Sequence, residues 1–474
     1  MLFPTIDFAV FFGIVFLGHW LLNPRPKLWK SFMVVASYVF YGWWNWHFIF
    51  LLGLSTLIAQ AGAIGIQRTE DERTRRRLLA LTIGAALGLL AWFKYGGFLS
   101  VNVDNTLRFL HLGSPLPLLQ VALPVGISFF TFMEISYVVD VYRRKLRPAA
   151  WLDFAVYLSF FPHLVAGPIV RGQELLPQIR TRRDPRRIDY SRAVYLIFSG
   201  LFKKIVISNF LASAIVDPVF GAPGQHSGLE ILFAIYGYAV QIYADFSGYT
   251  DIAIGVAMLL GVQFPENFDA PYSARSLQDF WRRWHMTLSR WLRDYLYIPL
   301  GGSRGTELRT YRNVMITMVL GGLWHGAAWT FVAWGALHGL GLVGGAVRRK
   351  RRIEHGLPAL ADGPTDRALQ RVATFHLVCL GWVFFRADSL GTAFALLVRL
   401  VTSFGTAPLV TPAVVGAVAL GIGAQYLNRD VPARLIDRFS QLRPAAQGAM
   451  LAIVLFAITS LGPQGVAPFI YFRF

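Results

Sequence analysis

The sequence predicts an all-α, polytopic integral membrane protein, and three observations lead to this fold class. Of the 474 residues, 55% are hydrophobic and only 15% are charged, whereas soluble domains carry about 25% charged residues. The mean hydropathy is +0.48. Apolar runs of ~20 residues recur along the whole chain, and each is long enough to cross a bilayer.

Short basic loops between the apolar runs indicate how the chain threads the membrane. The formal net charge is +19, and the excess gathers in Arg25–Lys30, Arg68–Arg77, Arg143–Arg147 and Arg348–Arg352. Basic residues in such loops usually face the cytoplasm. The charge therefore indicates membrane topology and not nucleic-acid binding. We expect about eleven crossings, starting with Phe3–Leu22 as a retained span, because that segment has no basic start typical of a signal peptide.

Later spans follow the same pattern, with one irregular segment. We expect crossings at Leu116–Tyr142 and near Ala449–Leu461, and two helices within the uncharged run Val314–Val347. The apolar segment Trp151–Val170 has basic clusters on both sides and contains Pro162, so we predict a re-entrant or broken helix. Irregular backbone at membrane depth needs protein or a cavity to satisfy its polar groups. This segment therefore predicts a cavity.

The segment Ser276–Leu300 is predicted to be an amphipathic helix lying in the membrane interface. At 100° per residue, one stripe is aromatic and apolar, and His285 lies at its edge facing the helical bundle. The opposite face carries Arg282, Arg283, Arg290 and Arg293. This pattern is typical of interfacial helices. The arginines either meet anionic lipid headgroups or dock the phosphates of an anionic cofactor.

Polar residues also interrupt apolar stretches elsewhere. The motif YADFSGYTDIAIG places Asp245, Ser247, Tyr249 and Asp251 at membrane depth, where carboxylates usually face a cavity or pair with a cation. A proton relay, an ion site and a structural hydrogen-bond network all fit, and the network is the simplest. His163, in the broken segment, is expected to serve packing or capping.

His325 is the most informative of these polar residues. It lies in LGGLWHGAAW, where a buried imidazole is either a hydrogen-bonded structural residue or a general base kept from water. Gly321, Gly322 and Gly326 leave space for another group to approach it. His338 is either its hydrogen-bond neighbour or unrelated. Burial among Trp324, Leu323 and Trp329 would favour the neutral imidazole that a base requires.

The remaining composition argues against metal and redox chemistry. No two of the ten histidines have i, i+3 or i+4 spacing, and Cys379 is the single cysteine. We therefore expect no metal site and no disulfide. The sequence also contains no P-loop, which argues against direct ATP chemistry.

Ten ordered motifs from about Leu123 to Phe474 resemble the membrane-bound O-acyltransferase (MBOAT) family, in particular its bacterial alginate O-acetyltransferase branch. The longest are DFWRRWHMTLSRWLRDYLYIPLGG and RNVMITMVLGGLWHGAAWTFVAWGALHG, and others are FFPHLVAGPIVR, GLFKKIVISN, NFDAPY and the C-terminal APFIYF. The resemblance implies one membrane domain over residues 1–474, with the catalytic region at about 123–386. It also implies a helical bundle with re-entrant segments and interfacial helices around a central tunnel.

The resemblance further implies a catalytic histidine in the tunnel, which maps onto His325, and a second polar residue, which maps onto His285. We take as candidate tunnel residues Trp324, Asp245, Ser247, Tyr249, Asp251 and His163. The implied donor is acetyl-CoA or another acyl-CoA, with no permanently bound cofactor. The implied setting is the bacterial inner membrane, where separate periplasmic proteins pass the acetyl group, directly or indirectly, to a polysaccharide.

Alternatives remain open at this stage. A transporter, a channel or a scaffold of a polysaccharide export complex would explain Asp245, Asp251 and the broken helix. However, no inverted repeat is visible, and such repeats are typical of transporters. Within the family, D-alanyl transfer and longer acyl chains remain alternatives to acetyl transfer.

Overall fold

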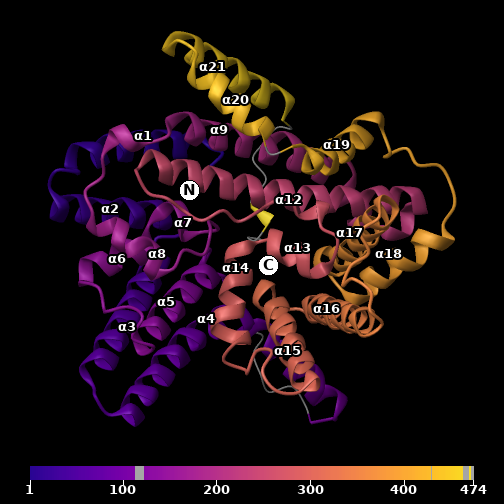
Figure 1. Ribbon diagram of the computed structural model, residues 1–474, viewed down its shortest axis with the longest axis horizontal. Coiled ribbons are helices and arrows are strands. Elements are labelled where there is room, and N and C mark those ends of the chain that lie inside the picture. Colours follow the sequence, from indigo (N-terminus) through magenta and orange to yellow (C-terminus); the bar gives the residue numbers. More distant parts are fainter. Residues whose placement is uncertain (113–121, 429, 463–468, 471–474) are drawn as a thin grey trace. The chain divides into compact units, whose positions relative to one another are not determined.

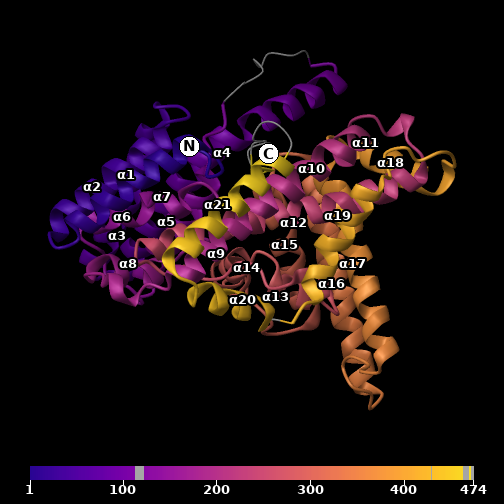
Figure 2. The same cartoon turned by 90° about the horizontal axis from the view of Figure 1, so that it is seen from above.

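The computed structural model describes residues 1–112, 122–428, 430–462 and 469–470, and within these ranges the chain contains helices and no strand. It divides into two compact units, and Figures 1 and 2 show its helices coloured along the sequence. Unit 1 comprises Met1–Asp189 with Val256–Pro265, and unit 2 comprises Tyr190–Gly255 with Glu266–Phe474. The prediction of an all-α architecture is confirmed for the described residues.

Six helices in the described ranges are long and apolar enough to cross a membrane. They are Phe48–Arg68, Glu72–Phe109, Tyr190–Gly221, Trp329–Glu354, Pro364–Arg386 and Pro444–Leu461. Of these, Tyr190–Gly221 comprises α9, α10 and α11 together with the π-helical segments that join them. Shorter apolar helices occur at Ile6–Leu22, Leu390–Thr402 and Pro412–Tyr426. The chain is therefore a multi-pass membrane protein, while the figure of about eleven crossings stays a prediction.

Unit 1 is built from helices α1 to α8. Their bounds are α1 Ile6–Leu22, α2 Pro26–Gly42, α3 Phe48–Arg68, α4 Glu72–Phe109, α5 Ile127–Tyr142, α6 Trp151–Ser159, α7 Phe161–Leu164 and α8 Gly172–Arg180. Residues 116–121 of the expected span Leu116–Tyr142 lie outside the described residues, and the helix in this region starts at Ile127. Gly126 precedes it with φ +81°, a conformation that favours glycine.

The predicted break in Trp151–Val170 is present between α6 and α7. Phe160 has ψ 107°, so the helix stops there, and Pro162 lies in the first turn of the short helix that follows. The turn after α7 packs tightly, because a Cβ on Gly167 would lie 2.5 Å from His163 Cα. The broken-helix prediction is thus confirmed, and the membrane re-entry stays a prediction.

Unit 2 contains the helices from α9 onward. Their bounds are α9 Tyr190–Leu201, α10 Asn209–Leu211, α11 Asp217–Gly221, α12 Gly228–Leu259, α13 Leu277–Arg283, α14 Met286–Leu292, α15 Glu307–His325, α16 Trp329–Glu354, α17 Pro364–Arg386, α18 Leu390–Thr402, α19 Pro412–Gly423, α20 Asp430–Ser440 and α21 Pro444–Leu461. The last residues of α12 belong to unit 1. Figure 2 shows α16 and α17 running side by side to the loop that joins them.

Glycines bring α15 and α16 into close backbone contact. A Cβ on Gly322 would lie 2.2 Å from Phe331 O, and one on Gly335 would lie 2.5 Å from Met318 O. Small residues allow such close approach between membrane helices. A Cβ on Gly326 would lie 2.0 Å from the Phe331 ring. The expectation that these glycines leave space for another group is therefore wrong for Gly322 and Gly326, because Phe331 fills that space.

The prediction of one continuous helix over Ser276–Leu300 is also wrong. The helix is interrupted at Trp284 and His285, between α13 and α14, and a π-helical segment, Arg293–Tyr297, follows α14. His285 has φ 42° and ψ 56°, the left-handed conformation that costs energy in a residue other than glycine. Periodicity could not reveal this break, because the stripe of apolar residues continues across it.

Candidate active site

His325 is the last residue of α15 and is 3% exposed. Its ring packs against three aromatic rings, with centroids 4.9 Å away at Trp324, 5.1 Å at Trp334 and 5.0 Å at Phe385. The expected cover from Trp329 is wrong, since that side chain is 57% exposed. The apolar surroundings instead come from α16 and α17, which sequence distance alone could not show.

His285 is fully buried at the junction of α13 and α14, as the prediction that it faces the bundle requires. Its Nδ1 lies 3.2 Å from Asn267 Oδ1. The same oxygen accepts hydrogen bonds from the backbone N (3.1 Å) and the hydroxyl (2.9 Å) of Thr287. The amide oxygen of Asn267 can only accept hydrogen bonds, so the His285 nitrogen that faces it must donate. In neutral His285 the proton is therefore on Nδ1. Its Nε2 then carries the lone pair.

Trp324 brings the two histidines together. Its ring centroid is 6.1 Å from that of His285 and 4.9 Å from that of His325. His285 also contacts Phe246 edge-on, with ring centroids 4.6 Å apart and an interplanar angle of 89°. The two histidines selected from the sequence therefore both contact one tryptophan in unit 2, although His285 precedes α14 and His325 ends α15.

His338 is not the hydrogen-bond neighbour of His325. The Trp334 ring contacts both, at 5.1 Å from His325 and 4.8 Å from His338. Neither ring nitrogen of His338 has a hydrogen-bond partner in the described part of the chain. His338 instead contacts Trp281, 5.3 Å away.

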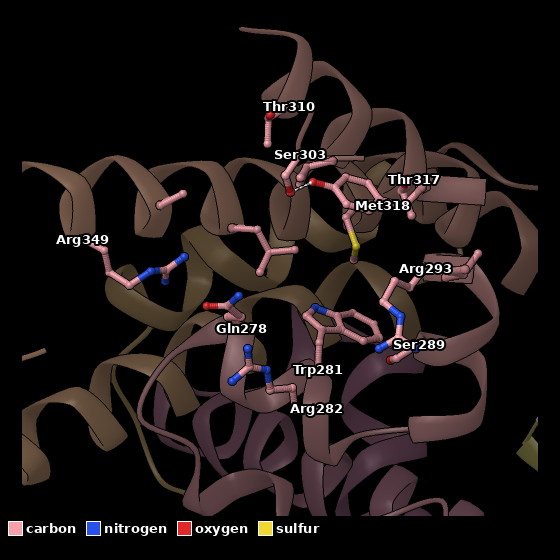
Figure 3. Close-up of a pocket in the computed structure, with 15 residues that line it drawn as sticks. Gln278, Trp281, Arg282, Ser289, Arg293, Ser303, Thr310, Thr317, Met318 and Arg349 are labelled. Atoms are coloured by element: carbon pink, nitrogen blue, oxygen red, sulfur yellow. Dashed lines mark hydrogen bonds between the residues drawn. The ribbon is translucent and has the colours of Figure 1, made fainter. Parts of the chain in front are cut away.

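A pocket of about 420 Å³, which we call the Trp281 pocket, opens beside this aromatic group (Figure 3). Its walls come from α13, α14, α15 and α16 and the π-helical segment. The lining residues are Gln278, Trp281, Arg282, Ser289, Leu292, Arg293, Tyr297, Ser303, Thr310, Val314, Thr317, Met318, Leu342, Ala346 and Arg349. Met318 lies seven residues before His325 on α15, which places it on the same helix face and about 10 Å along the axis.

Only part of the predicted arginine face belongs to this pocket. Arg282 and Arg293 line it, whereas Arg283 and Arg290 do not. Arg283 instead donates to Asp279 at 2.8 Å. Arg282 and Arg283 are consecutive on α13, so their side chains leave the helix about 100° apart and only one of them faces the pocket.

The two carboxylates expected at membrane depth, Asp245 and Asp251, form ion pairs. Asp245 pairs with Lys204, and both side chains are almost fully buried. Asp245 also accepts a 2.8 Å hydrogen bond from the backbone N of Ile470. Asp251 pairs with Lys203. Neither carboxylate lines the Trp281 pocket, so their tunnel role, like that of Ser247 and Tyr249, stays a prediction.

Tyr249 contacts the C-terminal segment, with its ring 4.7 Å from that of Phe469. Of the C-terminal APFIYF motif, only Phe469 and Ile470 belong to the described residues. Phe469 also contacts Phe246, 5.6 Å away. The motif's visible part thus lies against α12 next to the ring that touches His285.

His163 belongs to unit 1, whereas His285 and His325 belong to unit 2. It is fully buried, and its Nε2 lies 3.1 Å from Tyr157 O. A nitrogen beside a carbonyl acts as the donor. This contact matches the packing and capping role expected for His163.

Three residues beside the predicted site were not selected from the sequence, namely the partner of His285, the partner of Asp245 and one arginine of the Trp281 pocket. Asn267 belongs to the quoted NFDAPY motif, Lys204 to GLFKKIVISN and Arg349 to the basic cluster after α16. The motifs marked two of these positions, but their partners are 18 or more residues away in the chain. Sequence spacing gave no means of pairing them.

Comparisons with known proteins identify the family of the chain. The family model described as MBOAT, membrane-bound O-acyltransferase family, matches residues 125–352. The chain is 37% identical to the probable alginate O-acetylase AlgI of Azotobacter vinelandii, covering 100% of both chains. It is 40% identical to the protein of that name from Pseudomonas aeruginosa, over 86% of this chain and 76% of the relative.

A peptidoglycan O-acetyltransferase of Helicobacter pylori is also 37% identical, over 83% of this chain and 78% of the relative. A buried histidine pair beside a pocket in an all-helical membrane protein suits an acyltransferase. The chain belongs to the membrane-bound O-acyltransferase family and is an enzyme of that class. Its relatives matched over their full length include probable alginate O-acetylases.

Proposed function

We propose that the protein moves an acetyl group from acetyl-CoA, arriving on the cytoplasmic side of a bacterial inner membrane, toward the hydroxyl groups of an extracytoplasmic polysaccharide. The observation that carries the proposal is the meeting of His285 and His325 at Trp324. The proposal treats residues 1–474 as one membrane domain, with the central tunnel and interfacial segments that the family resemblance implies.

In this proposal His325 is the general base. As a hydroxyl oxygen attacks the thioester carbonyl, His325 accepts the hydroxyl proton, the C–S bond breaks, and the CoA thiolate leaves and is protonated. A neutral imidazole suits this role because its unperturbed pKa lies near the operating pH. Enclosure by Trp324, Trp334 and Phe385 limits access of water and therefore hydrolysis of the thioester.

His285 assists by orienting the reacting groups. Because its Nδ1–H is directed at Asn267, neutral His285 offers Nε2 as a hydrogen-bond acceptor. It can therefore orient a hydroxyl group. Polarising the thioester carbonyl, the other role expected for it, would require a proton on Nε2.

The Trp281 pocket is the proposed entrance for the donor. Its volume of about 420 Å³ falls within the range of ~300–1,000 Å³ that small-molecule sites occupy. Arg282, Arg293 and Arg349 line it, and so does Met318, which lies seven residues before His325 on α15. An apolar floor with cationic residues suits a pantetheine arm that carries phosphates at its far end.

The acceptor remains the broadest part of the proposal. Relatives of similar identity are named for alginate and for peptidoglycan. We therefore propose acetylation of an extracytoplasmic polymer, directly or through separate periplasmic proteins, without choosing the polymer.

The test uses purified protein in nanodiscs, with radiolabelled acetyl-CoA and periplasmic polysaccharide. We expect His325→Ala to lower acetyl transfer ~10²–10⁴-fold, the usual contribution of general acid–base catalysis. His285→Ala should lower it less. His376→Ala removes an exposed histidine that bonds Tyr236 and is the control. Full activity in His325→Ala would overturn the proposed mechanism.

A further inference from the structure

A second, smaller pocket lies between α16, α17 and the start of α13. We call it the Arg352 pocket, and its volume is about 180 Å³. The residues that line it are Arg275, Ser276, Leu277, Gly341, Gly345, Arg348, Arg349, Arg352, Ala359, Leu360, Ala361, Gln370, Ala373, Thr374 and Leu377. Four of these are arginines, and none is acidic.

One of the four arginines is already neutralised. Arg275 donates to Asp362 (2.8 Å), to Gln370 (2.9 Å) and to the carbonyl of Ala361 (2.7 Å). Asp362 also accepts from Arg367, 2.8 Å away. Hydrogen bonds from Arg367 and then Arg275 hold the pKa of the Asp362 carboxyl below its usual value of 3.8, so it is ionised at neutral pH. This network fixes one wall of the pocket.

The other three arginines keep their charge available. Arg348 and Arg349 make no hydrogen bond or ion pair with the residues that the structure describes, and Arg352 donates only from Nε, to Pro358 O at 2.9 Å. Three guanidinium groups around a cavity of this size favour an anion with several acceptor oxygens. Arginine binds phosphate in a bidentate, charge-assisted way.

The Arg352 pocket is a neighbour of the Trp281 pocket. Arg349 lines both. Leu277 and Gln278, consecutive on α13, face one pocket each, and a Cβ on Gly341 would lie 2.4 Å from Leu277 Cδ1. The close contact of α13 with α16 thus separates two pockets that share Arg349 at their edge.

The sizes indicate how the two pockets divide a ligand. At about 180 Å³ the Arg352 pocket is smaller than whole small-molecule sites, which occupy ~300–1,000 Å³. It suits one end of a longer molecule whose remainder lies in the Trp281 pocket. Acyl-CoA has this form, with a thin pantetheine arm and phosphates gathered at the nucleotide end.

We propose that the Arg352 pocket binds the nucleotide phosphates of acyl-CoA while the pantetheine arm occupies the Trp281 pocket and reaches toward His325. This inference rests on the proposed function in taking acyl-CoA as the donor. Arg348, Arg349 and Arg352 are its phosphate-binding residues. An anionic lipid headgroup offers the same phosphate chemistry, and the test separates the two sources.

The experiment compares two thioesters in nanodiscs, namely acetyl-CoA and S-acetyl-pantetheine, which lacks phosphates. We expect Arg348→Gln and Arg352→Gln each to raise KM for acetyl-CoA by roughly tenfold, the loss of one charge-assisted hydrogen bond. KM for S-acetyl-pantetheine should not change. Arg351→Gln is the matched control, because it removes the same charge from the same stretch of α16 without lining either pocket.

Three outcomes would overturn the inference. The first is equal KM values for the two variants and the control. The second is an effect present in nanodiscs with anionic lipid but absent in neutral phosphatidylcholine, which would assign the pocket to lipid headgroups. The third is failure of unacetylated CoA to bind the wild type. If CoA binds through these arginines but no acetyl is transferred, the phosphate site stands and the proposed catalytic function fails.

Discussion

Around His325, unit 2 buries imidazole rings among aromatic side chains, whereas around Asp245 it buries two opposite charges against each other. Both places are almost completely shielded, and Phe246 follows Asp245 in the chain while its ring touches His285. Lys204 forms an ion pair with the Asp245 carboxylate, and the backbone N–H of Ile470 donates a hydrogen bond to it. His325 contacts the uncharged rings of Trp324, Trp334 and Phe385, and His285 contacts Trp324 and Phe246.

The difference indicates which of the two places can do chemistry. A buried ion pair is costly to disturb, because its charges have been removed from water and depend on each other. A neutral imidazole can gain and lose a proton with a much smaller change in solvation. We therefore expect the Lys204–Asp245 ion pair to stabilise unit 2 and to position Ile470. We expect the two histidines to take part in the reaction.

The largest expected effect on stability comes from breaking the ion pair. Asp245→Leu should lower the free energy of unfolding by ~3–5 kcal/mol, because it removes the carboxylate partner of Lys204 at a buried position. The double variant Lys204→Met with Asp245→Leu should recover most of this loss. Unfolding midpoints in detergent would measure both changes.

The comparison would fail if the single and double variants were equally unstable. Lys204→Met with Asp245→Asn keeps an acceptor oxygen for the Ile470 N–H and is the control for the C-terminal contact. It should resist proteolysis at the C-terminus better than the leucine double variant.

The next effect concerns Asn267, which orients His285. Asn267→Leu should lower kcat roughly ten- to hundredfold, since small misplacements of catalytic groups have costs of this size. KM for the donor should stay the same, because Asn267 lines neither pocket. Steady-state acetyl transfer measures both constants.

Asn209→Leu is the matched control for that variant. Asn209 is buried on α10, and its Nδ2 has no hydrogen-bond partner in the described ranges. Equal losses of kcat in the two variants would show that Asn267 contributes only to stability.

The smallest effect is expected at Thr287, whose hydroxyl donates to the same Asn267 oxygen at 2.9 Å. Thr287→Val keeps the shape of the side chain and the backbone bond, so it should cost only about 0.5–1.5 kcal/mol of stability. We expect kcat to change by less than threefold. A thermal unfolding scan beside an activity assay checks this, and a loss of kcat as large as that of Asn267→Leu would contradict it.

The sequence by itself determined the class of the protein. Its small share of charged residues and its repeated apolar runs predicted an all-α membrane protein. Pro162 and the flanking basic clusters predicted the break after α6, and the ordered motifs indicated the family. It also selected His285 and His325. The fold class, the helix break and the family are confirmed because hydrophobic length, proline placement and motif identity are local properties that do not depend on which distant residues meet, whereas the catalytic role of the two histidines stays a prediction.

Only the tertiary structure decided how the site is assembled. It placed Trp324 in contact with both histidines, broke the expected helix at His285 through a left-handed residue, and filled the space beside Gly322 with Phe331. It also paired Asp245 with Lys204 and set Arg349 between two pockets. Each of these contacts joins residues from different helices, and helix periodicity says which face a residue occupies but not which partner that face will meet.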